Sequence, residues 1–181
     1  MSGMDLTRLS TERLELAAVS EGDLDELHAL NADPRVWRHL PSGVHTDVQQ
    51  TRDQIADYTA DWERDGLGYW IARRGGELVG IGGVRRRPGG TWNLYYRIAA
   101  ERHGHGYATE VARAGVDAAA RLAPDEPVVA YLLEHNEASR RTAERVGLGL
   151  VWRGPDHEVP DGIRLVLADR TLDEATLGTL H

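Results

Sequence analysis

The chain of 181 residues contains no cysteine, no lysine and no phenylalanine, and all 21 of its basic side chains are arginine. Without cysteine there is no thiol nucleophile, no disulfide and no thiolate metal site. Without lysine there is no Schiff-base chemistry and no phosphate-binding lysine of the Walker type. Any chemistry therefore depends on histidine, carboxylate, hydroxyl and guanidinium groups or on the backbone, and we expect no metal centre.

Positive charge is also low relative to negative charge. Asp and Glu number 29 against 21 Arg, so the net charge is -8 and the pI is near 5.5. Nucleic-acid binding is dominated by neutralisation of phosphates, so this composition argues against a DNA partner and favours a neutral or cationic one. No apolar run reaches the ~20 residues that span a bilayer. Residues 1–9 lack the charged-then-apolar pattern of a secretory leader. We therefore expect no membrane partner and a cytoplasmic location.

The hydrophobic pattern predicts a mixed chain of helices and strands, in which 41% of the residues are hydrophobic. A period of 3.6 predicts helices over 21–32, 46–66, 108–122 and 139–146. A period of 2, or a short apolar run, predicts strands over 13–19, 69–73, 77–85, 91–98, 128–133, 150–153 and 163–168. Because a helix joins strand 91–98 to strand 128–133, these two are expected to be parallel neighbours. We find no repeat or linker, and we expect one α+β domain over residues 1–181.

The most informative stretch leads from strand 91–98 through a glycine loop into the next helix. Gly104 and Gly106 let the backbone approach a ligand closely. The unpaired N–H groups of the first helical turn point at such a ligand with the positive end of the helix dipole, and Arg102 would add a charged contact. The stretch fits an anion site, and it fits equally well a tight turn between strand and helix.

A second polar cluster, residues 135–139, follows strand 128–133. Asn136 or Ser139 in front of a helix is most often only an N-cap. The two clusters nevertheless lie at the carboxyl ends of strands expected to be parallel neighbours, which is where open sheets place ligands. Their joint position favours a functional site.

Four stretches form an ordered set along the chain: Thr11-Glu12-Arg13-Leu14-Glu15-Leu16, Asn31-Ala32-Asp33-Pro34-Arg35-Val36, His103-Gly104-His105-Gly106-Tyr107-Ala108-Thr109-Glu110, and Asn136-Glu137-Ala138-Ser139 followed by Glu144-Arg145-Val146-Gly147-Leu148. This set resembles the GCN5-related N-acetyltransferases, in particular the ribosomal-protein N-terminal acetyltransferases, and covers nearly the whole chain. The resemblance implies a twisted mixed sheet of about seven strands flanked by about four helices. Its fourth and fifth strands would splay apart to admit acetyl-CoA.

The resemblance also implies roles for the two clusters. The backbone around Arg97 and Ile98 would hold the pantetheine arm and polarise the thioester carbonyl. Asn136 would lie beside the cofactor. The pyrophosphate would bind the loop amides of His103, Gly104, His105, Gly106, Tyr107 and Ala108.

The chain departs from the family pattern at three positions. His103 stands where the loop usually has Arg or Gln. Ala143 stands where many relatives have the tyrosine that protonates the departing thiolate. The branch's alternative, an Asn-x-x-Ser pair, is present, so we assign the acid role to Ser139 and a positioning role to Asn136. Asn93 stands where this branch often has glutamate, and strand 91–98 carries no carboxylate.

The general base is left open by the sequence. An attacking amine must lose a proton, either to a side chain or through ordered water. Glu134, two residues before Asn136, is one candidate, and His39 and His157 in expected loops beside the cleft are two others. Each also fits an ordinary solvated side chain. Trp37, in the irregular segment after the first helix, is the best candidate for a wall of the acceptor pocket.

Three hypotheses follow. The first is transfer of acetyl from acetyl-CoA to a primary amine, a protein N-terminus or a cationic small molecule, by direct attack, since the chain offers no cysteine for a covalent intermediate. The second is a non-catalytic acyl-CoA-binding module, motivated by Ala143 and the missing carboxylate. The third is a structural domain in which the glycine turn has no ligand. A monomer and a homodimer fit the sequence equally.

Overall fold

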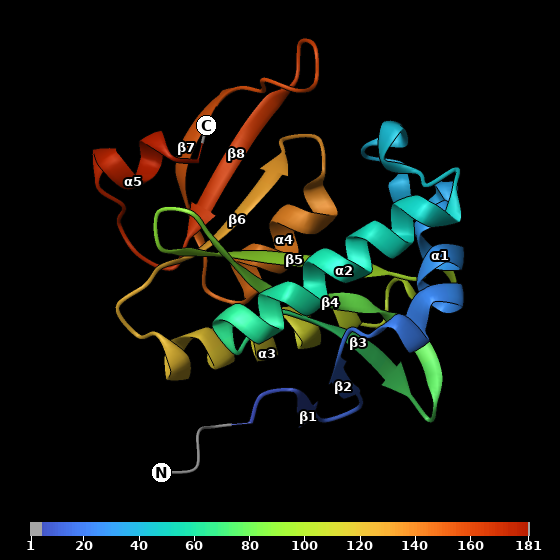
Figure 1. Ribbon diagram of the computed structural model, residues 1–181. Coiled ribbons are helices and arrows are strands. Elements are labelled where there is room, and N and C mark those ends of the chain that lie inside the picture. Colours follow the sequence, from blue (N-terminus) through green and yellow to red (C-terminus); the bar gives the residue numbers. More distant parts are fainter. Residues whose placement is uncertain (1–4, 181) are drawn as a thin grey trace.

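In a computed structural model, residues 5–180 form one eight-stranded sheet with helices on both faces (Figure 1). Residues 1–4, part of the segment without a leader pattern, and residue 181 lie outside the described residues. The strands are β1 (Arg8–Ser10), β2 (Glu15–Ala18), β3 (Tyr69–Arg74), β4 (Glu77–Arg87), β5 (Thr91–Ile98), β6 (Val128–Leu133), β7 (Gly149–Pro155) and β8 (Ile163–Ala168). Their order is β1-β2-β3-β4-β5-β6-β8-β7, and β5 with β6 is the parallel pair among them.

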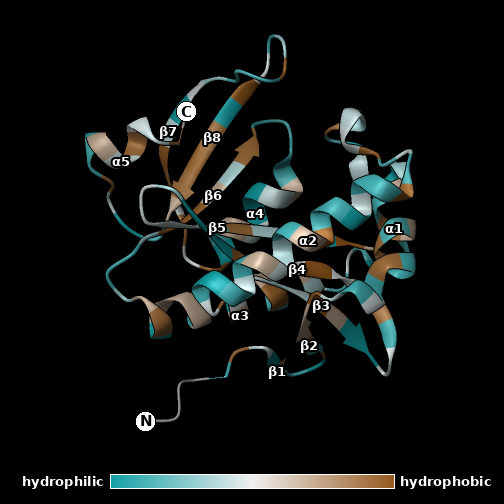
Figure 2. Ribbon diagram, viewed as in Figure 1, coloured by the Kyte–Doolittle hydropathy of each residue, from teal (hydrophilic) through white to brown (hydrophobic). Residues whose placement is uncertain are grey.

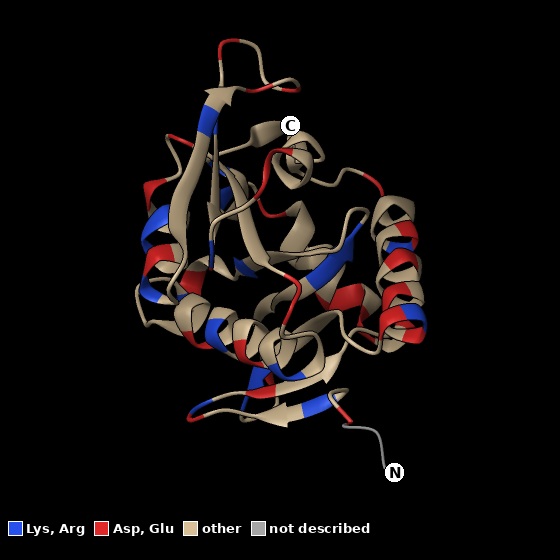
Figure 3. Ribbon diagram, turned by 90° about the vertical axis from the view of Figure 1, so that its left-hand side faces the viewer, with Lys and Arg blue, Asp and Glu red and all other residues tan. Residues whose placement is uncertain are grey.

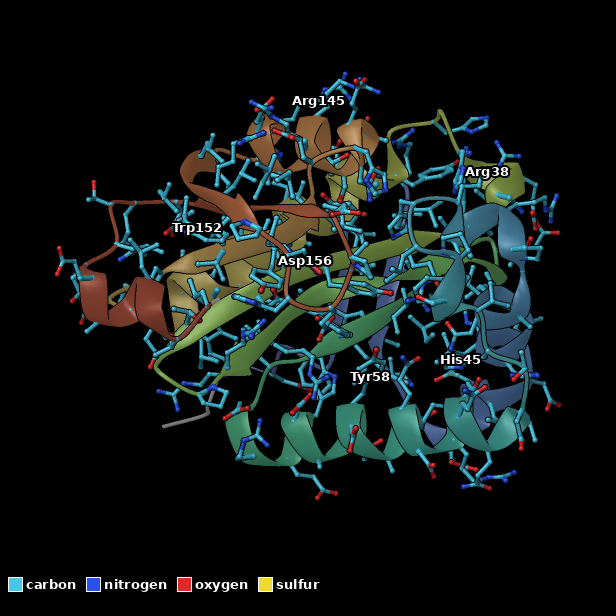
Figure 4. The ribbon with its side chains drawn as sticks, turned by 90° about the horizontal axis from the view of Figure 1, so that it is seen from above. Arg38, His45, Tyr58, Arg145, Trp152 and Asp156 are labelled. Atoms are coloured by element: carbon cyan, nitrogen blue, oxygen red, sulfur yellow. The ribbon has the colours of Figure 1, made fainter. Side chains whose placement is uncertain are left out.

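Two helices cover each face of the sheet. The helices are α1 (Leu24–Ala32), α2 (Val48–Asp65), α3 (Tyr107–Leu122), α4 (Glu137–Arg145) and a short α5 (Glu174–Gly178). Figure 4 shows α2, with Tyr58, on one side of the sheet and α4, with Arg145, on the other. Because strand side chains alternate, Tyr95 of β5 packs with the α1 and α2 cluster, whereas Leu94 and Ile98 pack with the α3 and α4 cluster.

The amphipathic pattern explains the placement of the helices. In α2, Thr51, Ile55, Tyr58 and Trp62 recur every three to four residues and are buried, so they form one stripe against the sheet. Figure 2 shows apolar residues concentrated in the central strands and hydrophilic ones on the outer turns of α2. Asp and Glu lie mainly on helices and loops around the sheet (Figure 3). No helix within residues 5–180 is long and apolar enough to cross a membrane.

The expected mixed α and β architecture is confirmed, with two additions. The seven expected strands are present, and β1 is an eighth that pairs with β2 through only three residue pairs. Such a strand is too short to show a period. The four expected helices are present, α5 is a fifth, and a 3-10 turn at Glu21–Asp23 precedes α1. The irregular segment 36–44 overlaps the 3-10 turn Pro34–Trp37 and contains the 3-10 turn Pro41–Gly43.

The splay of the fourth and fifth expected strands, β5 and β6, is also confirmed. They are paired over three residue pairs only, from Trp92 with Val128 to Leu94 with Ala130. Beyond that point β5 stays paired with β4 as far as Ile98, and β6 stays paired with β8. The two strands therefore separate toward their carboxyl ends, which leaves backbone N–H and C=O groups of β5 on that side without a strand partner.

Candidate functional site: a cleft at the splayed strands

A cavity of about 750 Å³ opens where β5 and β6 separate. Ligand pockets commonly measure roughly 300–1,000 Å³. The carboxyl halves of both strands line it, together with the glycine loop before α3, the start of α4 and the segment between α1 and α2. The residues expected from the sequence that line it are Trp37, His39, Arg97, Ile98, Arg102, His103, Gly104, Gly106, Tyr107, Ala108, Asn136 and Ser139. Tertiary structure thus brings the two sequence clusters into one cavity.

The glycine loop has the backbone conformation of an open anion cradle. Gly104 and Gly106 have φ values of 77° and 79°, in the left-handed region that favours glycine. Gly106 is the N-cap of α3 and has no side chain to cap the helix. The N–H groups of the first turn therefore have no side-chain cap from this residue. A Cβ at Gly104 would meet no protein atom within 4 Å, so this side of the loop is open.

The loop is held in shape from outside the cavity. Arg13, between β1 and β2, donates from Nη1 to the carbonyl of His105 at 2.8 Å and forms an ion pair with Glu110 at 2.7 Å. Its guanidinium lies 4.6 Å from the ring centre of Tyr107. The ring of His105 stacks on Tyr107 at 5.7 Å and does not line the cavity. His105 therefore contributes its backbone and its bracing contacts to the loop.

The side chains of Arg102 and His103 already have protein partners. Arg102 forms an ion pair with Glu77 of β4. Nε2 of His103 lies 2.7 Å from the carbonyl oxygen of Ile98. His103, which departs from the family pattern, thus ties the loop to the end of β5 through its side chain. His103 also lines the cavity.

Ser139 and Tyr96 form a hydrogen-bonded pair across the cleft. Ser139 Oγ donates to the Tyr96 hydroxyl at 3.1 Å, and that hydroxyl donates to the carbonyl of Ser139 at 2.6 Å. Burial raises the pKa of Tyr96 to about 12, so the phenol stays protonated near neutral pH. Asn136 Oδ1 accepts from the Ser139 N–H at 3.2 Å and caps α4.

Tyr96 also lines the cavity, although the sequence did not single it out. Tyr96 lies on β5 between Leu94 and Ile98, with which it shares one face of the strand. That face is the one covered by α3 and α4, whose first residues line the cavity. The alternation of side chains in strand 91–98 was the sequence signal that places Tyr96 on the same face as Leu94 and Ile98.

The candidates for the general base have different surroundings. Glu134 does not line the cavity. Its carboxylate accepts from Nε and Nη2 of Arg153 at 2.7 and 3.0 Å, and these hydrogen bonds hold its pKa below the usual value. His157, in the loop between β7 and β8, does not line the cavity either. The structure therefore does not bring Glu134 or His157 together with Asn136 and Ser139 in the cavity wall.

His39 does line the cavity and is half-buried. Burial lowers the pKa of its imidazole, and the nearby charges of Arg97 and His135 lower it further. The ring stacks beside Trp37 at 6.2 Å, and Nε2 of His135 lies 2.8 Å from the His39 carbonyl oxygen. A neutral imidazole in this wall has a free nitrogen lone pair and can accept a proton.

Arg97 is the charged group at the α1 and α2 end of the cavity. It is 7% exposed, and its guanidinium carbon lies 3.6 Å from the ring centre of Trp37 and 5.2 Å from that of Tyr95. Its Nη1 donates to the side-chain oxygen of Asn31. Burial lowers the pKa of Arg97 to about 10, which still leaves it charged near neutral pH. Trp37 donates from Nε1 to the Asn31 carbonyl at 2.7 Å and lines the cavity.

Comparison with known proteins gives one consistent family. The family described as "Acetyltransferase (GNAT) domain" matches residues 13–149. The uncharacterized protein YkkB of Bacillus subtilis (strain 168) is 30% identical over 148 residues, which cover 78% of this chain and 85% of YkkB. An acetyltransferase of Agrobacterium tumefaciens str. C58 is similar in structure, with a TM-score of 0.75 and 26% identity over 92% of this chain and 96% of its own. RimL, a ribosomal L7/L12 alpha-N-protein acetyltransferase solved in complex with coenzyme A, has a TM-score of 0.78 and 21% identity over 92% and 98% of the two chains.

Proposed function

The chain belongs to the GNAT acetyltransferase family, and from that premise we propose that it transfers the acetyl group of acetyl-CoA to a primary amine by direct attack. The observation that carries the proposal is that the splayed strands, the glycine loop and the Ser139–Tyr96 pair share one cavity. RimL, of the same fold, acts on the amine of a protein N-terminus and binds coenzyme A. We also propose a single domain and a cytoplasmic location.

The cavity has the groups that a CoA thioester needs. The backbone N–H groups from His103 to Ala108 would bind the pyrophosphate at the start of α3. Arg102, together with Arg141 and Arg145 of α4, lines the same end and would add charge-assisted contacts. The backbone of β5 beyond Leu94 lacks a strand partner on the cavity side and would pair with the amides of the pantetheine arm as an added strand does. Acetyl-CoA supplies the acyl carbon that the amine attacks.

The leaving sulfur would receive its proton from the Ser139–Tyr96 pair. Ser139 Oγ donates to Tyr96, and the phenol stays protonated because burial raises its pKa to about 12. The pair can therefore donate a proton to the sulfur and be reprotonated from solvent. Asn136 positions Ser139 by accepting from its N–H at the start of α4.

The attacking amine would lose its proton to His39. This imidazole lines the cavity, and burial together with Arg97 and His135 lowers its pKa, so the neutral form dominates near pH 7. A base must be unprotonated to act, and the usual pKa of histidine is already close to the working range. His39 would thus act as the general base, a role for which β5 offers no carboxylate.

The test is thiol release from acetyl-CoA over an amine panel, combined with calorimetry using coenzyme A. Amine-dependent thiol release with coenzyme A binding supports the transferase. Binding without amine-dependent release contradicts it and supports the acyl-CoA-binding module. The absence of both identifies a structural domain whose glycine turn has no ligand.

A further inference from the structure

The cavity is cationic although the chain is acidic overall. The described residues that line it include five arginines and two histidines, and no Asp or Glu, while the whole chain has a net charge of -8. The phosphates of a CoA ligand account for arginines at the glycine loop and at α4. They do not account for Arg97, whose guanidinium contacts Trp37 and lies near Tyr95 at the opposite end of the cavity, beside α1 and α2.

Arg97 differs from the other arginines of the cavity in its partners. Arg102, Arg141 and Arg164 each form an ion pair with a carboxylate, those of Glu77, Glu137 and Asp156. Arg145 is exposed to solvent, which screens its charge. Arg97 is the one buried arginine among the described residues, and its side-chain hydrogen-bond partner is the neutral carboxamide of Asn31.

Among the described residues, the rest of the surroundings of Arg97 supply no negative charge either. The described side chains that contact it or interact with it electrostatically include the aromatic and imidazole groups of Trp37, Tyr95, Tyr58, Tyr69, His39 and His45. The buried carboxylate of this region, Asp61, is already paired with both Arg64 and Arg85. A buried ion without a counterion is costly. An anionic ligand that enters the cavity would offset that cost.

We propose that Arg97 selects an acceptor amine that carries a carboxylate close to its nitrogen, as a free α-amino acid does. This inference rests on the acetyl transfer proposed above and names the class of its acceptor. A guanidinium binds a carboxylate through two parallel hydrogen bonds in a planar fork. The Trp37 ring lies against the guanidinium, with its centre 3.6 Å from the guanidinium carbon, which leaves the N–H edge as the part that binds. The acidic composition led us to expect a cationic acceptor, but the positive charge of the cavity favours one that carries a carboxylate. Net charge governs the rate of encounter rather than recognition in the site.

The small size of the acceptor follows from burial. Arg97 is 7% exposed, so the carboxylate must enter the cavity to reach it. The amine must stand at the thioester in the same cavity, so only a few bonds can separate the two groups. In a protein or peptide, the C-terminal main-chain carboxylate is far from the N-terminal amine and cannot reach Arg97 together with it. A protein N-terminus is therefore the acceptor class that competes with the free amino acid.

The experiment compares matched acceptors in the thiol-release assay. Each set contains a free amino acid, its amide, the decarboxylated amine, and a peptide that begins with the same residue, and the sets cover apolar, polar, acidic and basic side chains. The amide has the less protonated amine at neutral pH, so a preference for the acid cannot arise from amine reactivity. We expect at least one free acid to exceed its amide and its decarboxylated amine in kcat/KM by about tenfold or more, as a hydrogen-bonded charge pair would give.

Variants of the wild-type protein identify the residue responsible. Arg97→Met keeps an unbranched apolar stem and should reduce the acid-to-amide ratio to about one through a higher KM for the acid, whereas Arg97→Lys should keep part of it. A merely structural role for Arg97 would lower the rates for acid and amide alike and leave the ratio unchanged. Arg102→Met, at the CoA end of the same cavity, should raise the KM for acetyl-CoA without changing the ratio. If Arg97→Met does not fold, the wild-type comparison of acid with amide still decides.

Each outcome has a distinct meaning. Acetylation of amides and decarboxylated amines at rates equal to the acids refutes the carboxylate site and leaves the transferase intact. Acetylation confined to peptides refutes it in favour of a protein N-terminus. Acetylation of no amine refutes the transferase, and the acceptor class with it. A preference for acids that persists in a folded Arg97→Met protein refutes the role of Arg97.

Discussion

Gly106→Val tests whether the glycine loop binds the pyrophosphate of coenzyme A. Gly106 has a φ of 79° and begins α3. A Cβ there would lie 3.4 Å from the flexible end of Arg13, so the protein itself has room for the first added atom. The added branch would instead stand in front of the N–H groups that face the ligand. We expect coenzyme A affinity to fall at least about tenfold, or about 1.4 kcal/mol.

The matched control is Gly66→Val, at the end of α2 and away from the cavity. Gly66 has a φ of 68°, and a Cβ there meets nothing within 4 Å. Left-handed backbone costs a residue with a side chain about 1–2 kcal/mol, which in a chain of this size lowers Tm by about 2–8 °C. Both variants should therefore lose similar stability, but only Gly106→Val should lose affinity.

The assays are a thermal melt and calorimetric titration of each variant with coenzyme A. A folded Gly106→Val protein with the wild-type dissociation constant would remove the pyrophosphate from this loop. Equal loss of affinity in Gly66→Val would show that strain anywhere in the fold, rather than occlusion of the loop, weakens binding.

Three further predictions concern the proton path and the bracing of the loop. Ser139→Ala and Tyr96→Phe should each lower the single-turnover rate about tenfold or more with little change in acetyl-CoA affinity; a destabilised Ser139→Ala protein with the full rate would show that Ser139 only supports the start of α4. In the pH profile of kcat/KM, the acidic limb due to His39 should lie below pH 6.5, because the pKa of His39 is lowered and its neutral form persists to lower pH. His39→Gln should abolish that limb. An unchanged profile in the variant would exclude His39 as the base. Burial raises the pKa of Glu110, but the hydrogen bonds from Thr11 and Arg13 outweigh it and lower the pKa overall. The stabilisation by Glu110 is therefore present above pH 4.5 and lost as pH falls through the lowered value. Glu110→Gln should lower the free energy of unfolding by about 1–2 kcal/mol at neutral pH. Thermal melts of both proteins at a series of decreasing pH values should show this difference becoming smaller in acid. A difference that stays constant with pH would contradict the linkage.

Local signals predicted most of the secondary structure, and their errors are also local. At the start of α2 the spacing of a capping box fits Thr46 with Gln49 as well as Asp47 with Gln50, and Asp47 with Gln50 forms it. Both pairs satisfy the same spacing, so sequence alone cannot choose between them. The strand β1 escaped notice because Arg8–Ser10 is stabilised by pairing with β2 rather than by a period of its own.

The site was predictable where backbone conformation decides and less so where side chains converge from distant segments. The glycine loop was found because Gly104 and Gly106 mark left-handed backbone next to a helix start. His39 could only be one of three candidates for the base, because it lies in the segment between α1 and α2 and approaches β5 through tertiary packing alone.

The sequence by itself determined the mixed α and β class, the order of the elements, the glycine loop and the family resemblance, because these depend on periodicity and on residues that are neighbours along the chain. Only the tertiary structure decided which charges the cavity contains. It pairs Glu134 with Arg153 outside the cavity, and among the described residues it gives the buried Arg97 no carboxylate partner inside it. Such pairings depend on the register and curvature of strands far apart in sequence, and a long side chain reaches whichever partner the sheet brings within a few ångströms of it.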